Sequence, residues 1–176
     1  MMRKLTLALV ALFAVIAGAA QAHGPSRLKT EQEVVLNASP EEVWAVIGSF
    51  EDLSWLPDAG TVEADGNEKG ALRKRSLADG TVITEELLKR DEKKFAISTR
   101  LAEDNPAYVL ATNYALHLTI KDEGGKAKVE IKGAFYRAFP QNDPPADQND
   151  EASTANVEAL HQKIIDALVA KFGAAG

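Results

Sequence analysis

The chain has 176 residues, no cysteine and a formal net charge of −6 at pH 7. The lack of cysteine excludes disulfides and zinc–thiolate sites, and the acidic balance argues against nucleic acid as a partner because the phosphate backbone is also negative. A basic protein is a more favourable partner for such a surface.

The first 22 residues have the three parts of a cleavable secretory signal. Met1 to Lys4 carry positive charge, Leu5 to Ala17 form an apolar run broken only by Thr6, and Ala20-Gln21-Ala22 is a small-residue cleavage pattern. The run is shorter than the ~20 residues of a membrane-spanning helix, with an uncleaved anchor as the alternative. We therefore expect a periplasmic protein whose mature part, residues 23–176, is one domain without a membrane anchor. Removal of the two basic residues of the signal would change the charge from −6 to −8.

A strand and two short helices are predicted at the start of the mature part. Thr30 to Asn37 contains three consecutive apolar residues and is typical of a strand. Ser39 can cap a helix that starts at Pro40 and has an acidic first turn. A second helical turn is predicted over Leu53 to Leu56 and is expected to stop at Pro57, because the residue before proline disfavours helix.

From Thr61 to Arg137 the apolar period changes to two, which is typical of strands. Gly66-Asn67, Asp79-Gly80 and Gly124-Gly125 are hairpin signals. This segment predicts a meander of about six antiparallel strands with one face toward a core and one toward water. Three runs have a shared side: Phe95, Ile97, Thr99 and Leu101; Tyr114, Leu116, Leu118 and Ile120; and Val129, Ile131, Gly133 and Phe135.

A long helix is predicted after a loop at residues 140–149. Its apolar stripe is spaced three or four residues apart, and Gly173 follows as a stop. The stripe consists of Val157, Leu160, Ile164, Leu168 and Phe172. Because the helix must bury this stripe, the concave face of a curled sheet is the available surface. The predicted fold class is therefore α+β: a curved antiparallel sheet of about six to seven strands around a long C-terminal helix, with two short helices after the first strand.

This order of elements, with Asn37-Ala38-Ser39-Pro40-Glu41-Glu42-Val43-Trp44 after the first strand, resembles the helix-grip (SRPBCC) superfamily. That superfamily includes START domains, pollen allergens, polyketide cyclases and the abscisic-acid receptors. The likeness runs from about Thr30 to Ala170. It implies a pocket between the sheet and the last helix.

A closer likeness is to the MxaD-type periplasmic proteins of bacterial methanol oxidation. It is carried by His23-Gly24-Pro25, Gly133-Ala134-Phe135-Tyr136-Arg137, Asn142-Asp143-Pro144-Pro145 and Asn149-Asp150-Glu151-Ala152. The resemblance implies an accessory protein that helps methanol dehydrogenase work with its cytochrome c acceptor. Trp55-Leu56-Pro57 departs from relatives that often have a histidine between Trp and Pro, which weakens any role for an imidazole there.

His161 is the first candidate for a ligand-binding residue. Its helical position lies near the middle of the apolar stripe, and a buried polar ring needs a partner or a ligand. The resemblance to the abscisic-acid receptors, which have a ligand-facing residue at the matching position, favours a pocket. A core histidine bonded to a backbone carbonyl or to water is the alternative.

Glu85 and Arg73 are predicted to form a pair across the Asp79-Gly80 hairpin. Glu85 alternates with Ile83 and Leu87, so it shares a face with apolar residues, and Arg73 would offset its desolvation. The resemblance places both in the polar lining of a pocket. The alternative is an exposed cross-strand pair, since a one-residue error in register would turn Glu85 outward.

Three aromatic residues complete the candidate set. Tyr114 lies on the apolar face of its strand and matches a ligand-contacting residue of the resembling receptors, although a purely structural core role is the alternative. Trp55 could close the mouth of the pocket, and Phe135 lies on the apolar face of the last strand. His117, on the face opposite Tyr114, is predicted to be exposed.

The sequence predicts no metal site, cofactor motif, serine-centred elbow or phosphate loop. Three functions remain open. The first is a non-enzymatic periplasmic accessory protein with a pocket for a small apolar ligand and with methanol dehydrogenase and cytochrome c as partners. The second is an enzyme of the cyclase or aromatase type that uses Glu85, Tyr114 or His161 as acid and base. The third is a lipid or small-molecule carrier.

Overall fold

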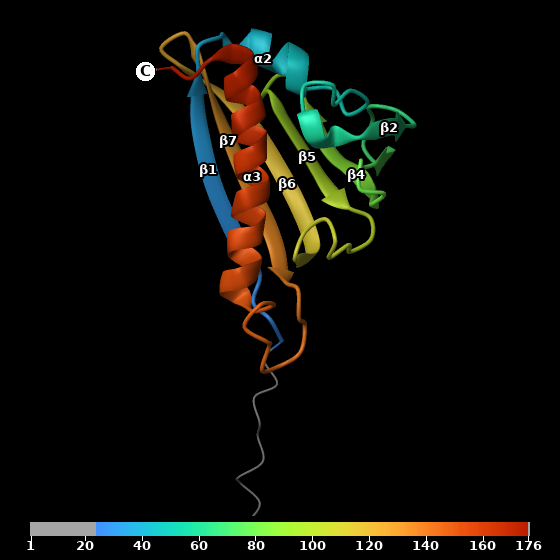
Figure 1. The fold of residues 1–176 in the computed structure, drawn as a ribbon. Helices are drawn as coiled ribbons and strands as arrows, with labels where there is room; N and C mark the ends of the chain where they lie inside the picture. Colours follow the sequence, from blue (N-terminus) through green and yellow to red (C-terminus); the bar gives the residue numbers. More distant parts are fainter. Residues whose placement is uncertain (1–23, 176) are drawn as a thin grey trace, which may run out of the picture.

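The computed structural model describes residues 24–175, so the expectations for the signal at residues 1–22 lie outside the described part. These residues form a curved seven-stranded sheet of order β1-β7-β6-β5-β4-β3-β2, in which all neighbouring strands are antiparallel (Figure 1). The elements are β1 (Leu28–Leu36), α2 (Pro40–Ile47), the 3₁₀ helix η1 (Pro57–Ala59), β2 (Thr61–Ala64), β3 (Leu72–Ser76), β4 (Val82–Asp91), β5 (Ala96–Leu101), β6 (Ala111–Glu123), β7 (Lys126–Arg137) and α3 (Asp150–Phe172). The predicted fold class is confirmed.

The helix α2 begins as predicted, with a capping box. The Ser39 side chain accepts a hydrogen bond from the backbone N–H of Glu42 (3.3 Å), and the Glu42 carboxylate accepts one from the backbone N–H of Ser39 (2.8 Å). The predicted turn over Leu53 to Leu56 is present, since the backbone N–H of Leu56 donates to the Leu53 carbonyl oxygen (2.9 Å), but the helical segment does not stop at Pro57. Pro57 begins η1 instead of ending a helix, because proline suits the first helical position, where no N–H is needed.

The three glycine-containing hairpin signals all fall between strands, as predicted. Gly124 and Gly125, between β6 and β7, have φ angles of +65° and +85°, a region that favours glycine. One turn was missed. Phe95 has a φ of +46° and lies in the turn before β5, not on that strand, yet its ring packs 5.7 Å from the ring of Trp44.

The helix α3 lies across the concave side of the sheet, over β1 and β7 (Figure 1). Its buried residues are Ser153, Val157, His161, Ile164, Ala167 and Leu168. It ends at Gly173, with φ +76°, as predicted. A Cβ added to Gly133 of β7 would lie 2.6 Å from Thr30 Oγ1 and 3.0 Å from His161 Cε1. Glycine at this point therefore allows the close approach of the helix to the sheet.

The core fills the space between the sheet, α2 and α3. A larger cluster surrounds Trp44, Phe50 and Leu168, and a smaller one contains Tyr114, Phe135 and Val157. In the described range, residues 24–175, none of the helices has both the length and the apolar character needed to cross a membrane.

Candidate functional site: a cavity with a buried Arg–Glu–Arg cluster

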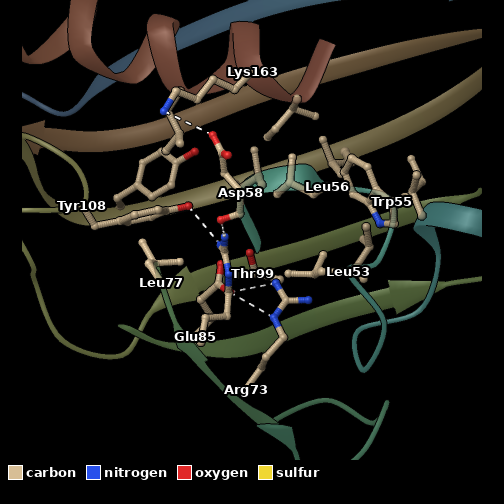
Figure 2. A pocket seen from close by; sticks show the side chains of 18 of the residues that line it. Leu53, Trp55, Leu56, Asp58, Arg73, Leu77, Glu85, Thr99, Tyr108 and Lys163 are labelled. Atoms are coloured by element: carbon tan, nitrogen blue, oxygen red, sulfur yellow. Dashed lines mark hydrogen bonds and ion pairs between the residues drawn. The ribbon is translucent and has the colours of Figure 1, made fainter. Parts of the chain in front are cut away.

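A cavity of about 190 Å³ lies among the strands of the sheet, the segment around η1, and α3 (Figure 2). This is somewhat larger than the ~150 Å³ cavity that is known to admit a benzene molecule. Its apolar wall includes Ile47, Leu53, Trp55, Leu56, Ile97, Leu116, Leu118, Leu160 and Ile164. Asp58 and Lys163 also line it, and because both are largely exposed and 3.7 Å apart they mark its opening.

Two arginines and one glutamate form the polar part of the wall. Arg73 and Glu85 lie directly opposite each other on β3 and β4, and the Arg73 Nε and Nη2 atoms are 3.0 and 2.9 Å from Glu85 Oε2. Arg75, two residues along the same face of β3, has Nη1 at 3.7 Å from the same oxygen. The three side chains are at most 8% exposed.

The same arginines attach the segment around η1 to the sheet. Arg75 donates from Nε to the Ala59 carbonyl oxygen (3.0 Å) and from Nη2 to that of Asp58 (3.3 Å). Arg73 Nη1 donates to the Phe50 carbonyl oxygen (2.7 Å), and its guanidinium carbon lies 4.3 Å from the centre of the Phe50 ring. Each arginine therefore contributes both to a cavity wall and to a packed segment.

Burial shifts the pKa of Arg73 and of Tyr108, a neighbour of the cluster. Desolvation lowers the pKa of Arg73, and the adjacent Glu85 opposes this; a guanidinium nevertheless stays charged at any physiological pH. Arg75 Nη1 donates to the Tyr108 hydroxyl (3.2 Å), whose pKa is raised, mainly by burial. The polar wall is thus a group of two cations and one anion beside a neutral phenol.

A second polar pair lies behind the cavity. Tyr114 lines the wall, and its hydroxyl is hydrogen-bonded to His161 Nε2 at 2.9 Å. Burial raises the pKa of Tyr114 well above its usual range and lowers the pKa of His161 to about 4. Both side chains are therefore uncharged at neutral pH. The Nδ1 atom of His161 is buried without a hydrogen-bond partner among residues 24–175.

The structure brings four of the six predicted site residues to one cavity: Arg73, Glu85, Tyr114 and Trp55. The side chain of Glu85 lies on the inner face of the sheet, and its predicted pairing with Arg73 is confirmed. His161 and Phe135 are fully buried but are not part of the cavity wall. Of the two alternatives for His161, the structure has the core histidine, bonded to the Tyr114 hydroxyl rather than to a backbone carbonyl or water. Because α3 lies over β1 and β7, this side of the helix meets the sheet, and Leu160 and Ile164 reach the cavity instead.

His117 also differs from its prediction. It is half-buried on the outer face of β6, where Nδ1 lies 2.8 Å from Ser98 Oγ. The wall residues that were not predicted as site residues include Arg75, Tyr108, Asp58 and Lys163. Arg75 had a signal, since it alternates with Arg73 on the same strand. Tyr108 lies in a loop, Asp58 in η1 and Lys163 at the edge of the apolar stripe of α3. At these positions the sequence has no alternation that would indicate which side chains face the cavity.

Several residues that carry the MxaD-type resemblance have a structural role. Arg137, at the end of β7, donates to the carbonyl oxygens of Phe139 and Gln141 (both 2.7 Å) and lies 3.3 Å from the carboxylate of Asp150. The Asn149 side chain caps α3 by accepting from the backbone N–H of Ala152 (2.8 Å). These contacts hold the loop before α3 in place, away from the cavity wall.

No group of three or more His, Cys, Asp or Glu side chains is arranged to hold a metal ion anywhere in the described range. The cavity has no histidine on its wall, and its lone buried carboxylate, that of Glu85, already contacts two arginines. The chemistry that this wall offers is hydrogen-bond donation and positive charge beside an apolar surface.

Comparison with known proteins supports the same architecture. Residues 27–173 match the family model described as polyketide cyclase / dehydrase and lipid transport. A search of the curated proteins gave no match. Among solved structures, a protein of Bacillus thuringiensis is 25% identical, with a TM-score of 0.64 and a match covering 81% of this chain and 96% of that one.

Two other solved structures are similar over most of the chain. The protein XoxI from Bacillus cereus is 25% identical, with a TM-score of 0.65, and the match covers 84% of this chain and 95% of that one. Truncated norcoclaurine synthase from Thalictrum flavum is 16% identical, with a TM-score of 0.60 and coverage of 83% and 93%; this likeness concerns the fold alone. The chain belongs to the polyketide cyclase / dehydrase and lipid transport family and has the Bet v 1-like helix-grip fold.

Proposed function

We propose that the protein is a non-enzymatic binding protein that holds a small, mainly apolar molecule in the cavity between α3 and the segment around η1. The observation that carries this proposal is the cavity itself, an apolar hollow of about 190 Å³ in an otherwise packed core, with a few converging polar groups on one side. Pockets for small molecules usually combine these two features. The carboxylate of Glu85 is held by arginines, which favours a binding role over a proton-transfer role.

Isothermal titration calorimetry with 3-phenylpropan-1-ol, a neutral and mainly apolar compound with one ring, tests the proposal. We expect saturable binding with one site per chain. Leu160→Trp, which places a larger side chain at the cavity wall, should weaken binding at least tenfold, whereas Leu72→Trp, at a position 45% exposed and off the wall, should leave it unchanged. Equal binding by both variants, or no saturable binding by the natural protein, would refute the cavity as the binding site.

We further propose that the protein is located in the periplasm and that methanol dehydrogenase and its cytochrome c acceptor are its partners. The signal-like residues 1–22, the negative net charge and the residues of the MxaD-type resemblance support this. An acidic surface favours a basic partner at low ionic strength. Cross-linking to both proteins should succeed at ~20 mM salt and weaken at ~300 mM. No contact with either protein at low salt would contradict the partnership.

A second candidate function is an enzyme of the cyclase or aromatase type. It is favoured by the Tyr114 hydroxyl, which stands at the cavity wall with His161 hydrogen-bonded behind it. If the protein turns over an aromatic precursor, Tyr114→Phe should lower kcat by about 10²-fold or more while leaving KM nearly unchanged. Unchanged kcat in that variant would remove the pair from any catalytic role.

Lipid carriage is the third candidate, and the family description supports it. Native mass spectrometry of the protein purified from its host under mild conditions should then show a mass increment that disappears on denaturation. A spectrum of the bare chain alone would count against carriage of a tightly held lipid.

A further inference from the structure

We infer that the cavity selects small molecules that carry a carboxylate on an apolar body, with the carboxylate seated against Arg73 and Arg75. This inference rests on the proposed binding function and names the class of ligand. It follows from the charge and the hydrogen-bond donors of the cavity wall, and from the depth at which they lie.

The buried charge of the wall does not balance. Arg73, Arg75 and Glu85 are 5%, 3% and 6% exposed, so two cations share one anion in a region of low dielectric. Charges that are out of water need nearby partners, because their desolvation is expensive. One further negative group in the cavity would neutralise the cluster.

The unused hydrogen-bonding groups of the wall are mainly donors. The Nη1 and Nη2 atoms of Arg73 each contact one protein acceptor, so each retains a second N–H. Figure 2 shows the Arg73 guanidinium between Glu85 and Leu53, beside the apolar lining. A ligand that satisfies these groups must therefore bring acceptors.

Other charged groups near the cavity do not offset the cluster. Asp58 and Lys163 pair with each other at the opening, and both are more than half exposed. Asp79 is exposed in the β3–β4 turn, where its carboxylate accepts from the Thr81 N–H (2.8 Å). Water screens charges at such positions. The second oxygen of Glu85 could accept from a ligand ammonium, and this makes an amine the competing ligand class.

Isothermal titration calorimetry at pH 7 with three matched compounds decides between these classes. The compounds are 3-phenylpropanoate, 3-phenylpropan-1-ol and 3-phenylpropylamine, which share one ring and one chain length. We expect the carboxylate to bind at least about tenfold more tightly than the alcohol or the amine, because charge-assisted hydrogen bonds are the stronger ones. Equal or tighter binding of the alcohol or the amine would overturn the inference while leaving the binding function intact.

Two variants localise the preference. Glu85→Gln removes the competing anion and should tighten carboxylate binding about three- to tenfold, with the alcohol unchanged; Arg73→Gln should abolish the preference for the carboxylate. Arg100→Gln is the matched control, because Arg100 pairs with Glu86 on the outer face of the sheet at 2.7 Å. If the Arg100 variant lost the preference for the carboxylate to the same extent, the preference would come from the net electrostatic field of the protein. That result would overturn the placement of the ligand carboxylate against Arg73. If none of the three compounds binds the natural protein, the proposed function itself fails.

Discussion

Burial sets the protonation state of His161, one of the few fully buried polar side chains of the protein. Its imidazole contacts Tyr114 through Nε2, while Nδ1 has no partner in the described residues. Desolvation penalises the charged form, and this lowers the pKa of the imidazole to about 4 from an unfolded value near 6.5. The folded protein therefore excludes a proton that the unfolded chain binds.

The sign of the resulting pH dependence follows from this difference. Above pH ~6.5 both states are neutral and the stability is complete; as the pH falls toward about 4 the unfolded state gains a proton first, and stability is lost. We expect this histidine to account for a decrease of up to about 3 kcal/mol in the free energy of unfolding across that range. Urea unfolding at several pH values measures it.

The variant Tyr114→Phe/His161→Leu removes the pair without leaving an unpartnered group, and its free energy of unfolding should vary less between pH 6.5 and 4. His117→Gln is the control on the outer face. The burial of His117 is partial, so most of the pH dependence should persist. A pH dependence identical in the double variant and in the natural protein would show that His161 is not excluded from protonation.

At the scale of secondary-structure elements, the packing of α3 on the sheet depends on Gly133. This residue lies opposite Thr30 in the β1–β7 register, and His161 and Val157 of the helix press on the same point, at 3.0 and 3.1 Å from an added Cβ. All of these neighbours are buried. None of them can move aside without disturbing the core.

Gly133→Ala should therefore lower the free energy of unfolding by about 1–3 kcal/mol through overpacking. The same substitution made in a Thr30→Ala background should be less harmful, because the nearest clashing atom, Thr30 Oγ1, is then absent. Denaturant unfolding of the four proteins of this cycle measures the coupling. Equal loss in both backgrounds would mean that Thr30 does not limit the space at Gly133.

The elements were largely predictable because their signals are local. Glycine pairs mark the hairpins. The alternation in β4 left its inner face open, and the choice of the face of Ile83, Glu85 and Leu87, which the structure confirms, rested mainly on the resemblance. The polar cavity wall was only half predictable: Arg75 shares the face of Arg73, but a charged residue more often points to water. The inward turn of His161 was predictable from helical spacing. Its exclusion from the cavity was not, because this depends on which strands lie beneath α3.

At the scale of the whole molecule, the cavity results from an uneven covering of the concave face. The helix α3 covers β1 and β7, while the segment around η1 covers the β3–β4 side, where the arginines hold it by their bonds to Phe50, Asp58 and Ala59 (Figure 1). Between these two covers the sheet is not filled by protein. Non-local packing of this kind has no sequence period, so the volume of the cavity could not be predicted.

The most direct measurement is the ¹H–¹⁵N NMR spectrum of the two tryptophan indole groups during ligand titration. Trp55 lines the cavity, whereas Trp44 lies in the core away from it, and Trp44→Phe assigns the two signals. With 3-phenylpropanoate or 3-phenylpropan-1-ol, we expect the Trp55 signal to move saturably with one site per chain while the Trp44 signal stays in place. Two unchanged signals at millimolar ligand, or movement of Trp44 alone, would contradict a binding cavity between α3 and the segment around η1.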